Sequence, residues 1–99
     1  AHITGGGLLE NIPRILPETA SVVLEKTWPV PPLFSFLIQA GDVSEQERYR
    51  VFNMGIGMVL VIDPKHLSRV ETMLKKAHEE FYLIGQVIDS KGGARVRLK

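Results

Sequence analysis

The chain has 99 residues, of which 44% are hydrophobic, with 12 basic and 11 acidic side chains and no cysteine. This is the length of one small domain or of part of one, and the nearly balanced charge gives no electrostatic reason to expect a nucleic acid or a membrane as partner. The lack of cysteine excludes a disulfide framework and a thiolate metal site and, together with the lack of an apolar run of transmembrane length, favours a cytoplasmic protein.

The chain opens on the stretch AHITGGGLLENIPR, which predicts a short strand, His2–Thr4, then three glycines and a helix. Apolar residues recur at helical spacing on one face of that helix, and they are Leu8, Leu9, Ile12, Ile15 and Leu16. On the opposite face Glu10 and Arg14 are four residues apart, the spacing of an ion pair. Pro13 falls in the first turn if the helix begins near Glu10 and kinks the helix otherwise, and Pro17 ends it.

Three consecutive glycines cost conformational entropy, so they indicate that a ligand or another backbone comes very close to this main chain. The glycines are Gly5, Gly6 and Gly7. Free N–H groups before a helix favour an anion, and Thr4, Asn11 and Arg14 add a hydroxyl, an amide and a guanidinium beside them. The spacing matches neither a P-loop nor GxGxxG. It leaves two interpretations open, phosphate binding and a tight backbone crossing.

The next predicted elements are a strand in SVVLEK and a helix in PVPPLFSFLIQAG. Pro32 suits the first position of this helix, and Gly41 suits the position just past its end. The helix is apolar on nearly all sides, so we expect it to be covered on more than one side. Ser44 and Glu47 form a capping box that begins a short polar helix in DVSEQERYRVFN.

The second half of the chain predicts three strands and a long helix. GIGMVLVI is apolar on both faces, which indicates a central strand covered on both sides. Asp63 and Pro64 begin the clearest helix, whose apolar residues continue to Phe81. FYLIGQVIDSKGGARVRLK predicts a hairpin that turns at Lys91-Gly92-Gly93. The predicted order is β-α-β-α-α-β-α-β-β, an α+β fold with helices packed on a mixed or antiparallel sheet.

A second glycine-rich stretch, FNMGIGM, repeats the theme with Asn53, Gly55 and Gly57. Alternate glycines leave a flat strip on a strand, so Asn53 and Gly55 are candidates for ligand contact, with helix–strand packing as the other interpretation. His2 precedes the first glycines and is the candidate catalytic residue, as an acid, a base or a donor that orients a ligand. The alternative is an ordinary hydrogen-bonded strand histidine.

The other charged residues predict no site. His66 and His78 lie too far apart in the long helix to share one metal, so no metal site is expected in this chain. Arg95, Arg97 and Lys99 alternate with apolar residues near the end of the chain. Because no aromatic residues are interleaved, they predict a solvated strand face rather than a nucleic-acid contact.

Two long stretches carry a family resemblance that covers nearly the whole chain. AHITGGGLLENIPRILP, followed by TWPVPPLFSFLIQAGDVSEQERYRVFNMGIGMVLVI, resembles the C-terminal domain of the phosphoribosylformylglycinamidine cyclo-ligases, also called aminoimidazole ribonucleotide synthetases. HITGGGLLENIPR and FNMGIGM in this order form the specific part of the likeness.

The resemblance implies an ATP-dependent ligase of purine biosynthesis. In this family ATP phosphorylates the formyl-amide oxygen of formylglycinamidine ribonucleotide, an amidine nitrogen attacks the activated carbon, and phosphate leaves. ATP and Mg²⁺ are held mainly by an N-terminal domain that dimerises. The implied partners are therefore the rest of the same polypeptide, a second copy in a homodimer and the nucleotide substrate.

Residues 1–99 then correspond to an incomplete C-terminal domain, because in the family a strand and a helix precede the HITGGG strand. The chain also begins at Ala1 rather than Met, which favours a fragment over a processed mature chain. We expect it to be inactive by itself. The alternatives are a related family of the same two-domain plan (selenophosphate synthetase, thiamine-monophosphate kinase or the formylglycinamidine-forming amidotransferase) and a free-standing phosphate-binding regulatory or interaction module.

Overall fold

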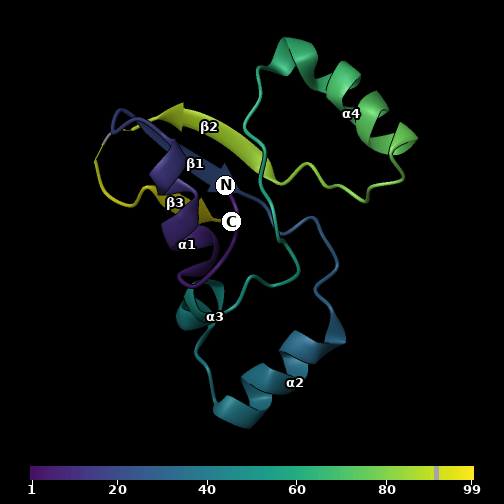
Figure 1. Ribbon diagram of the computed structural model, residues 1–99. Coiled ribbons are helices and arrows are strands. Elements are labelled where there is room, and N and C mark those ends of the chain that lie inside the picture. Colours follow the sequence, from purple (N-terminus) through teal and green to yellow (C-terminus); the bar gives the residue numbers. More distant parts are fainter. Residues whose placement is uncertain (91) are drawn as a thin grey trace.

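The computed structural model describes residues 1–90 and 92–99, and its elements are short (Figure 1). In chain order they are α1 (Gly7–Asn11), the 3₁₀ helix η1 (Pro13–Ile15), β1 (Ala20–Leu24), α2 (Pro32–Gly41), α3 (Glu45–Val51), the 3₁₀ helix η2 (Pro64–His66), α4 (Leu67–Lys76), β2 (Gly85–Asp89) and β3 (Val96–Leu98). The strands form one mixed sheet, which confirms the α+β class.

The sheet has the order β2-β1-β3, with β1 in the centre. β1 pairs antiparallel with β2, where Val22 lies opposite Val87, and parallel with β3, where Val22 lies opposite Val96. The β-branched residues of β1 suit this central position, because both of its edges are hydrogen-bonded and Val22 and Leu24 are buried.

The predicted C-terminal hairpin is wrong. β2 and β3 do not pair with each other, because β1 lies between them and takes a hydrogen-bonded neighbour on each side. Of the predicted turn, Lys91 lies outside the described residues, and Gly92 and Gly93 both have a positive φ. The sequence places these two strands close together in the chain. Which strand each of them pairs with depends on β1, which lies more than 60 residues earlier.

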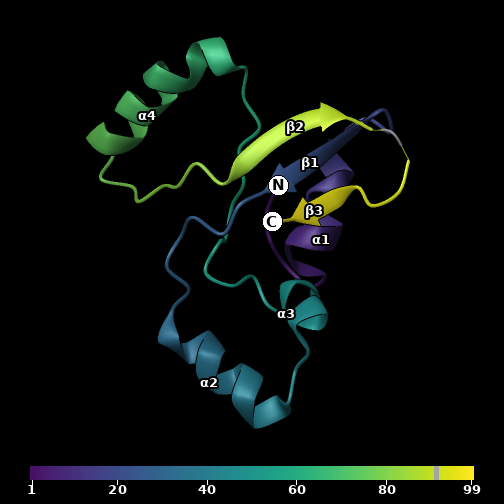
Figure 2. The same cartoon turned by 180° about the vertical axis from the view of Figure 1, so that it is seen from behind.

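The core lies where the N-terminal helix and α3 meet the sheet (Figures 1 and 2). Leu8 and Ile12 are the largest side chains with no exposed surface. The buried hydrophobic residues are Ile3, Leu8, Ile12, Val22, Leu24, Trp28, Tyr49, Met54, Ile56, Val59 and Val96. They come from both halves of the chain, so the residues around the glycines are anchored by contacts that are distant in sequence.

The first helix is shorter than its apolar pattern suggests. α1 begins at Gly7 rather than near Glu10, so Pro13 does not lie in its first turn. α1 therefore ends at Asn11, and the chain continues as the 3₁₀ helix η1 with Pro13 as its first residue. Arg14 is in η1 and no longer one helical turn below Glu10.

The predicted strands at His2–Thr4 and in GIGMVLVI reduce to one antiparallel bridge, His2 to Met58. Backbone hydrogen bonds also join Ile3 N to Gly57 O (2.9 Å) and Val59 N to Ala1 O (2.8 Å). Beyond Val59 the described residues offer no strand to pair with, and Leu60, Val61 and Ile62 are exposed. The prediction of a central strand covered on both sides is therefore wrong for this structure, because an extended segment without a neighbour forms no ladder.

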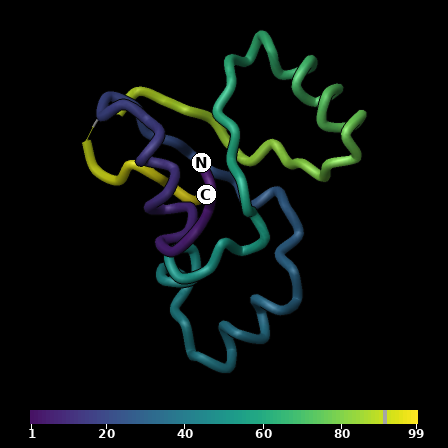
Figure 3. Tube along the Cα trace, in the orientation of Figure 1, coloured from purple at the N-terminus to yellow at the C-terminus, as the bar shows by residue number. Residues whose placement is uncertain are grey.

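α2 and α4 extend away from the sheet in different directions (Figures 1 and 3). α2 approaches the core through Phe34 and Ile38, and Phe34 packs edge-on against Phe52 with ring centroids 5.7 Å apart. No residue of either helix is buried. The expectation that α2 is covered on more than one side is not met by the residues that the structure describes.

Helix ends follow the predictions in part. Pro32 is the first residue of α2, but Gly41 is its last residue, and Asp42 takes the left-handed cap with φ 49°. Ser44 Oγ accepts a hydrogen bond from Glu47 N at the start of α3. The Glu47 carboxylate does not complete the capping box, because it pairs with Arg50 at 2.8 Å. Asp63 caps η2 by accepting from Lys65 N.

Candidate functional site

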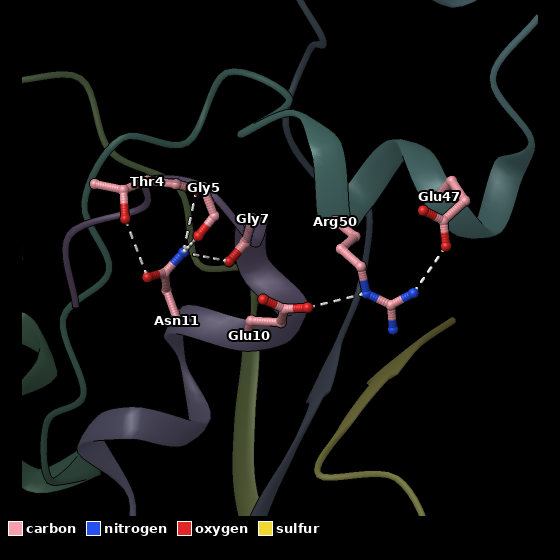
Figure 4. Close-up of polar contacts among 7 residues, drawn as sticks. All are labelled: Thr4, Gly5, Gly7, Glu10, Asn11, Glu47 and Arg50. Carbon is pink, nitrogen blue, oxygen red and sulfur yellow. Dashed lines mark hydrogen bonds and ion pairs between the residues drawn. The ribbon is translucent and has the colours of Figure 1, made fainter.

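The three glycines form a tight turn into α1 (Figure 4). Gly6 has φ +97° and Gly7 has φ +62°, values that side-chain-bearing residues rarely adopt. The turn is closed by a hydrogen bond from Gly7 N to Thr4 O (3.0 Å), and Glu10 N donates to Gly6 O (3.2 Å). The local backbone therefore explains why glycine stands at positions 6 and 7.

The two interpretations of the glycine run apply to different glycines. A Cβ on Gly7 would overlap Tyr49 O and lie 2.9 Å from Phe52 O, so Gly7 is a close crossing against the end of α3. A Cβ on Gly5 would meet nothing within 4 Å. Gly5 is thus the glycine whose backbone is open to a ligand, while Gly7 holds the turn against α3.

Asn11 organises the inner side of the turn and is 4% exposed. Its Nδ2 donates to Thr4 O (3.2 Å), Gly5 O (3.3 Å) and Gly7 O (2.8 Å), as Figure 4 shows. Its Oδ1 accepts from Thr4 Oγ1 (3.2 Å). The side chains of Thr4 and Asn11 are therefore engaged with each other and with the turn.

The predicted ion pair between Glu10 and Arg14 is absent. Glu10 Oε1 pairs instead with Arg50 Nε of α3 (3.2 Å), and Arg50 Nη1 continues to Glu47 (Figure 4). Arg14 Nη1 donates to Asn11 Oδ1 at 3.0 Å. This ion pair between α1 and α3 holds the Glu10 side chain next to Gly6. A Cβ on Gly6 would lie 2.5 Å from Glu10 Oε2.

Arg14 lies at a groove of about 650 Å³ between α1, η1, α3 and β3. The residues that line it are Leu9, Glu10, Pro13, Arg14, Gln46, Arg50, Ala94, Arg95, Val96 and Leu98. Three of these are arginines, and one of them, Arg95, was expected on a solvated strand face. That prediction is wrong for Arg95, whose guanidinium binds backbone carbonyls 75 or more residues earlier in the chain. No local sequence pattern predicts hydrogen bonds between an arginine and carbonyls so far away in the chain.

FNMGIGM forms a second turn next to the first. Asn53 Oδ1 accepts from Gly55 N (2.8 Å), and Trp28 Nε1 donates to Met54 O (2.9 Å). A Cβ on Gly55, which has φ +97°, would lie 2.6 Å from Pro31 Cδ. Gly55 is therefore in close packing contact, whereas a Cβ on Gly57 would meet nothing within 4 Å. The two turns are neighbours, because Phe52, just before Asn53, is at the crossing with Gly7.

His2 is exposed and takes part in the bridge to Met58. Its backbone lies beside the glycine turn in sequence, and its side chain makes no hydrogen bond to the described residues. In residues 1–90 and 92–99 no group of three His, Asp or Glu side chains is placed to hold a metal ion. None of the helices in that part of the chain is long and apolar enough to cross a membrane.

Comparison with known proteins decides the family. Residues 1–97 match the family described as AIR synthase related protein, C-terminal domain. The chain belongs to this family.

The AIR synthase related domain is also similar to named relatives. It is 48% identical over 93 residues to the phosphoribosylformylglycinamidine cyclo-ligase of Bacillus subtilis (strain 168), covering 93% of this chain and 27% of the relative. It is 49% identical over 92 residues to the protein of that name from Nitrosospira multiformis, covering 92% of this chain and 26% of the relative. For the relative from Thermoanaerobacter sp. (strain X514) the identity is 44% over 94 residues, covering 94% and 28%. The chain thus spans about a quarter of the length of these relatives.

Proposed function

We propose that this domain is part of an ATP-dependent cyclo-ligase that closes the imidazole ring of formylglycinamidine ribonucleotide. The observation that carries the proposal is the family match over residues 1–97, together with relatives of 44–49% identity that are all named phosphoribosylformylglycinamidine cyclo-ligase. The products are aminoimidazole ribonucleotide, ADP and phosphate, as the resemblance implies.

The proposed reaction requires hydrogen-bond donors that bind anionic phosphate groups. An amide oxygen is a poor leaving group, and transfer of a phosphoryl group to it makes a good one. The amidine nitrogen then attacks the same carbon, the carbon–oxygen bond breaks, and the oxygen leaves with the phosphate. Donors are needed for the transferring phosphoryl group and for the phosphate of the ribonucleotide.

The glycine turn supplies one wall of that site in our proposal. Gly5 and Gly6 present backbone to the substrate, and Arg14 offers a charged fork close by. Asn11 and Thr4 act through the turn, because their polar atoms are bonded to it or to each other. The backbone of the turn is thereby held in place before substrate binds.

In this proposal the same side of the substrate site is shaped by two turns. Gly7 and Gly55 contribute through close packing, and Asn53 through its hydrogen bond to Gly55 N. His2 is the proposed proton-transfer or orienting residue, since it is exposed and next to the turn.

Mg²⁺ and ATP are not assigned to residues of this chain. The described residues contain no carboxylate cluster that fits the ion, so we derive no step through it. We propose that the rest of the same polypeptide, an ATP-binding N-terminal domain in a homodimer, supplies that site. The cytoplasmic location likewise stays a prediction.

The test is turnover by the full-length protein with formylglycinamidine ribonucleotide, ATP and Mg²⁺. We expect aminoimidazole ribonucleotide and ADP in equal amounts, and Arg14→Ala to raise the substrate KM about ten- to a hundredfold, as loss of a charged hydrogen bond implies. Arg97→Ala is the matched control, because Arg97 is exposed and outside the groove. Phosphate binding without turnover would favour the free-standing module instead.

The same polypeptide is also the proposed cover for the exposed apolar surface. Leu33 and Phe36 of α2 are 62% and 67% exposed, and Met58 and Leu60 are 62% and 59% exposed. Surface of this kind is typical of a contact with another chain segment. That the relatives are more than three times longer supports an intramolecular partner.

A further inference from the structure

The groove between η1 and β3 brings together two arginines that are 81 positions apart, Arg14 and Arg95. None of the residues Thr4–Gly7 lines this groove, which adjoins the glycine turn through Leu9, Glu10 and Arg14. It is an open groove of about 650 Å³, so a small molecule bound there stays partly exposed to solvent.

Both arginines are held in place by neutral oxygens. Arg95 Nε donates to Ala20 O (2.9 Å), and Arg95 Nη2 donates to Pro17 O (2.9 Å) and Leu16 O (3.4 Å). Arg14 Nη1 donates to the amide oxygen of Asn11. These bonds fix the guanidinium groups without compensating their charge.

The carboxylate that lines the groove is already neutralised by an arginine that lines it too. Glu10 pairs with Arg50, and Arg50 also reaches Glu47. Neither Arg14 nor Arg95 forms an ion pair with any residue that the structure describes. The groove is therefore lined by two arginines, Arg14 and Arg95, that have no ion-pair partner among the described residues.

Donors also remain for a ligand. The hydrogen bonds use Nε and Nη2 of Arg95 and Nη1 of Arg14, so Arg95 Nη1 and two nitrogens of Arg14 have no acceptor among the described residues. Two guanidinium groups suit a phosphate, whose oxygens accept charged hydrogen bonds from several directions. The remaining lining of the groove is mostly apolar, with Leu9, Pro13, Ala94, Val96 and Leu98.

We propose that Arg14 and Arg95 form a binding site for a phosphate monoester, with the organic part of the ester against Val96 and Leu98. Arg14 is also part of the substrate wall in the proposed function, so the site rests on that function at this residue, and Arg95 and the apolar lining are what the groove adds to it. It differs from the glycine turn in using side-chain charge rather than backbone donors.

The test uses the full-length protein and phenyl phosphate as the probe. Carbon-13 methyl resonances of Val96 and Leu98 report binding in this groove and not elsewhere. We expect saturable shifts of these resonances, and dissociation constants at least about tenfold higher for Arg14→Gln and Arg95→Gln, which corresponds to about 1.4 kcal/mol. Arg97→Gln is the control, because Arg97 is in β3 and outside the groove, and this variant should bind as the parent does.

Ala94→Glu covers the case in which Arg95→Gln fails to fold. Ala94 is exposed and lines the groove, so a carboxylate there would compensate the two guanidinium groups without removing a native contact. We expect it to abolish the methyl shifts while leaving the thermal midpoint within a few degrees of the parent.

Unchanged shifts and affinity in Ala94→Glu, or in a folded Arg95→Gln, would overturn the proposal. A protein that binds phenyl phosphate in an arginine-dependent way but makes no aminoimidazole ribonucleotide would support the groove and refute the proposed function. Formation of aminoimidazole ribonucleotide with no methyl shifts on addition of phenyl phosphate would support the proposed function and refute the groove site.

Discussion

At the scale of single residues, Asn11 has the largest number of polar contacts near the glycine turn. The two hydrogens of its amide nitrogen are shared among three carbonyls, and its oxygen accepts from Thr4 and Arg14, all from a nearly fully buried position. Buried carbonyls that lose their donor cost free energy, because water cannot replace it there. Asn11 thus holds the turn together through its side-chain hydrogen bonds.

Asn11→Ala should lower the free energy of unfolding by about 2–3 kcal/mol, because it removes the side-chain donor of the buried Gly7 O together with two partly buried hydrogen bonds to Thr4 O and Gly5 O. Asn53→Ala is the matched control, since it removes one hydrogen bond at a partly exposed turn and should cost about 1 kcal/mol or less. Urea denaturation of both variants measures the difference. Equal losses would contradict the special role of Asn11.

At the scale of elements, α1 and α3 are joined by a backbone crossing and an ion pair. Gly7 lies against Tyr49 O and Phe52 O, while Glu10 and Arg50 link the two helices at the surface. The crossing tolerates no side chain, because a Cβ would overlap backbone atoms that cannot move independently. The ion pair is about half exposed, so it contributes little stability and mainly orients the two side chains.

Gly7→Ala should destabilise the protein by about 3 kcal/mol or more, from the left-handed backbone and the overlap with Tyr49 O together. Gly5→Ala provides the control, since a Cβ there meets nothing and should change stability by about 0.5 kcal/mol or less. Thermal unfolding distinguishes the two. If Gly5→Ala keeps the fold and raises the substrate KM, the open glycine is at the ligand, as proposed.

The loop after β1 is tied to α3 by Lys26, which binds Glu45 Oε1 at 3.1 Å and lies over the Tyr49 ring. The hydrogen bond and charge of Lys26, with the charge of Arg48, hold the pKa of Glu45 below its ordinary value. A carboxyl with a lowered pKa in the folded state adds stability above its unfolded pKa and loses it as the pH falls through the folded value. We expect Lys26→Met to remove a small acid-side dependence of the thermal midpoint, because Glu45 is at the surface. An unchanged pH profile would contradict this link.

At the scale of the whole molecule, the compact part is the sheet with α1 and α3, and α2, α4 and residues 58–62 extend from it (Figure 3). These extensions carry seven of the large exposed apolar residues. They are Leu33, Phe36, Met58, Leu60, Val61, Ile62 and Met73. An extended apolar segment with unpaired backbone is an aggregation hazard unless another strand or helix covers it.

Residues 1–99 expressed alone should therefore self-associate. Size-exclusion chromatography with light scattering should show oligomers, and Leu33→Glu with Phe36→Glu should reduce them by placing charge on the exposed face of α2. The same two changes in the full-length protein should lower its stability, because there we propose the face to be covered. A monodisperse monomer of residues 1–99 that unfolds cooperatively would refute the proposed cover.

Sequence by itself determined several local elements and the family. The β-branched run of β1, Pro32 at the start of α2, and the caps Ser44 and Asp63 are encoded by residues within a few positions of each other, so local preferences suffice to predict them. The stretch HITGGGLLENIPR was specific enough to indicate the family that residues 1–97 match.

Only the tertiary structure decided which distant groups meet. It placed β1 between β2 and β3, separated the packed Gly7 from the open Gly5, paired Glu10 with Arg50, and brought Arg95 to carbonyls of residues 16, 17 and 20. None of these follows from local pattern, because each depends on backbone or charge from a segment far along the chain. The same reason explains residues 58–62, whose apolar run predicts a strand but whose pairing requires a neighbour that the described residues do not provide.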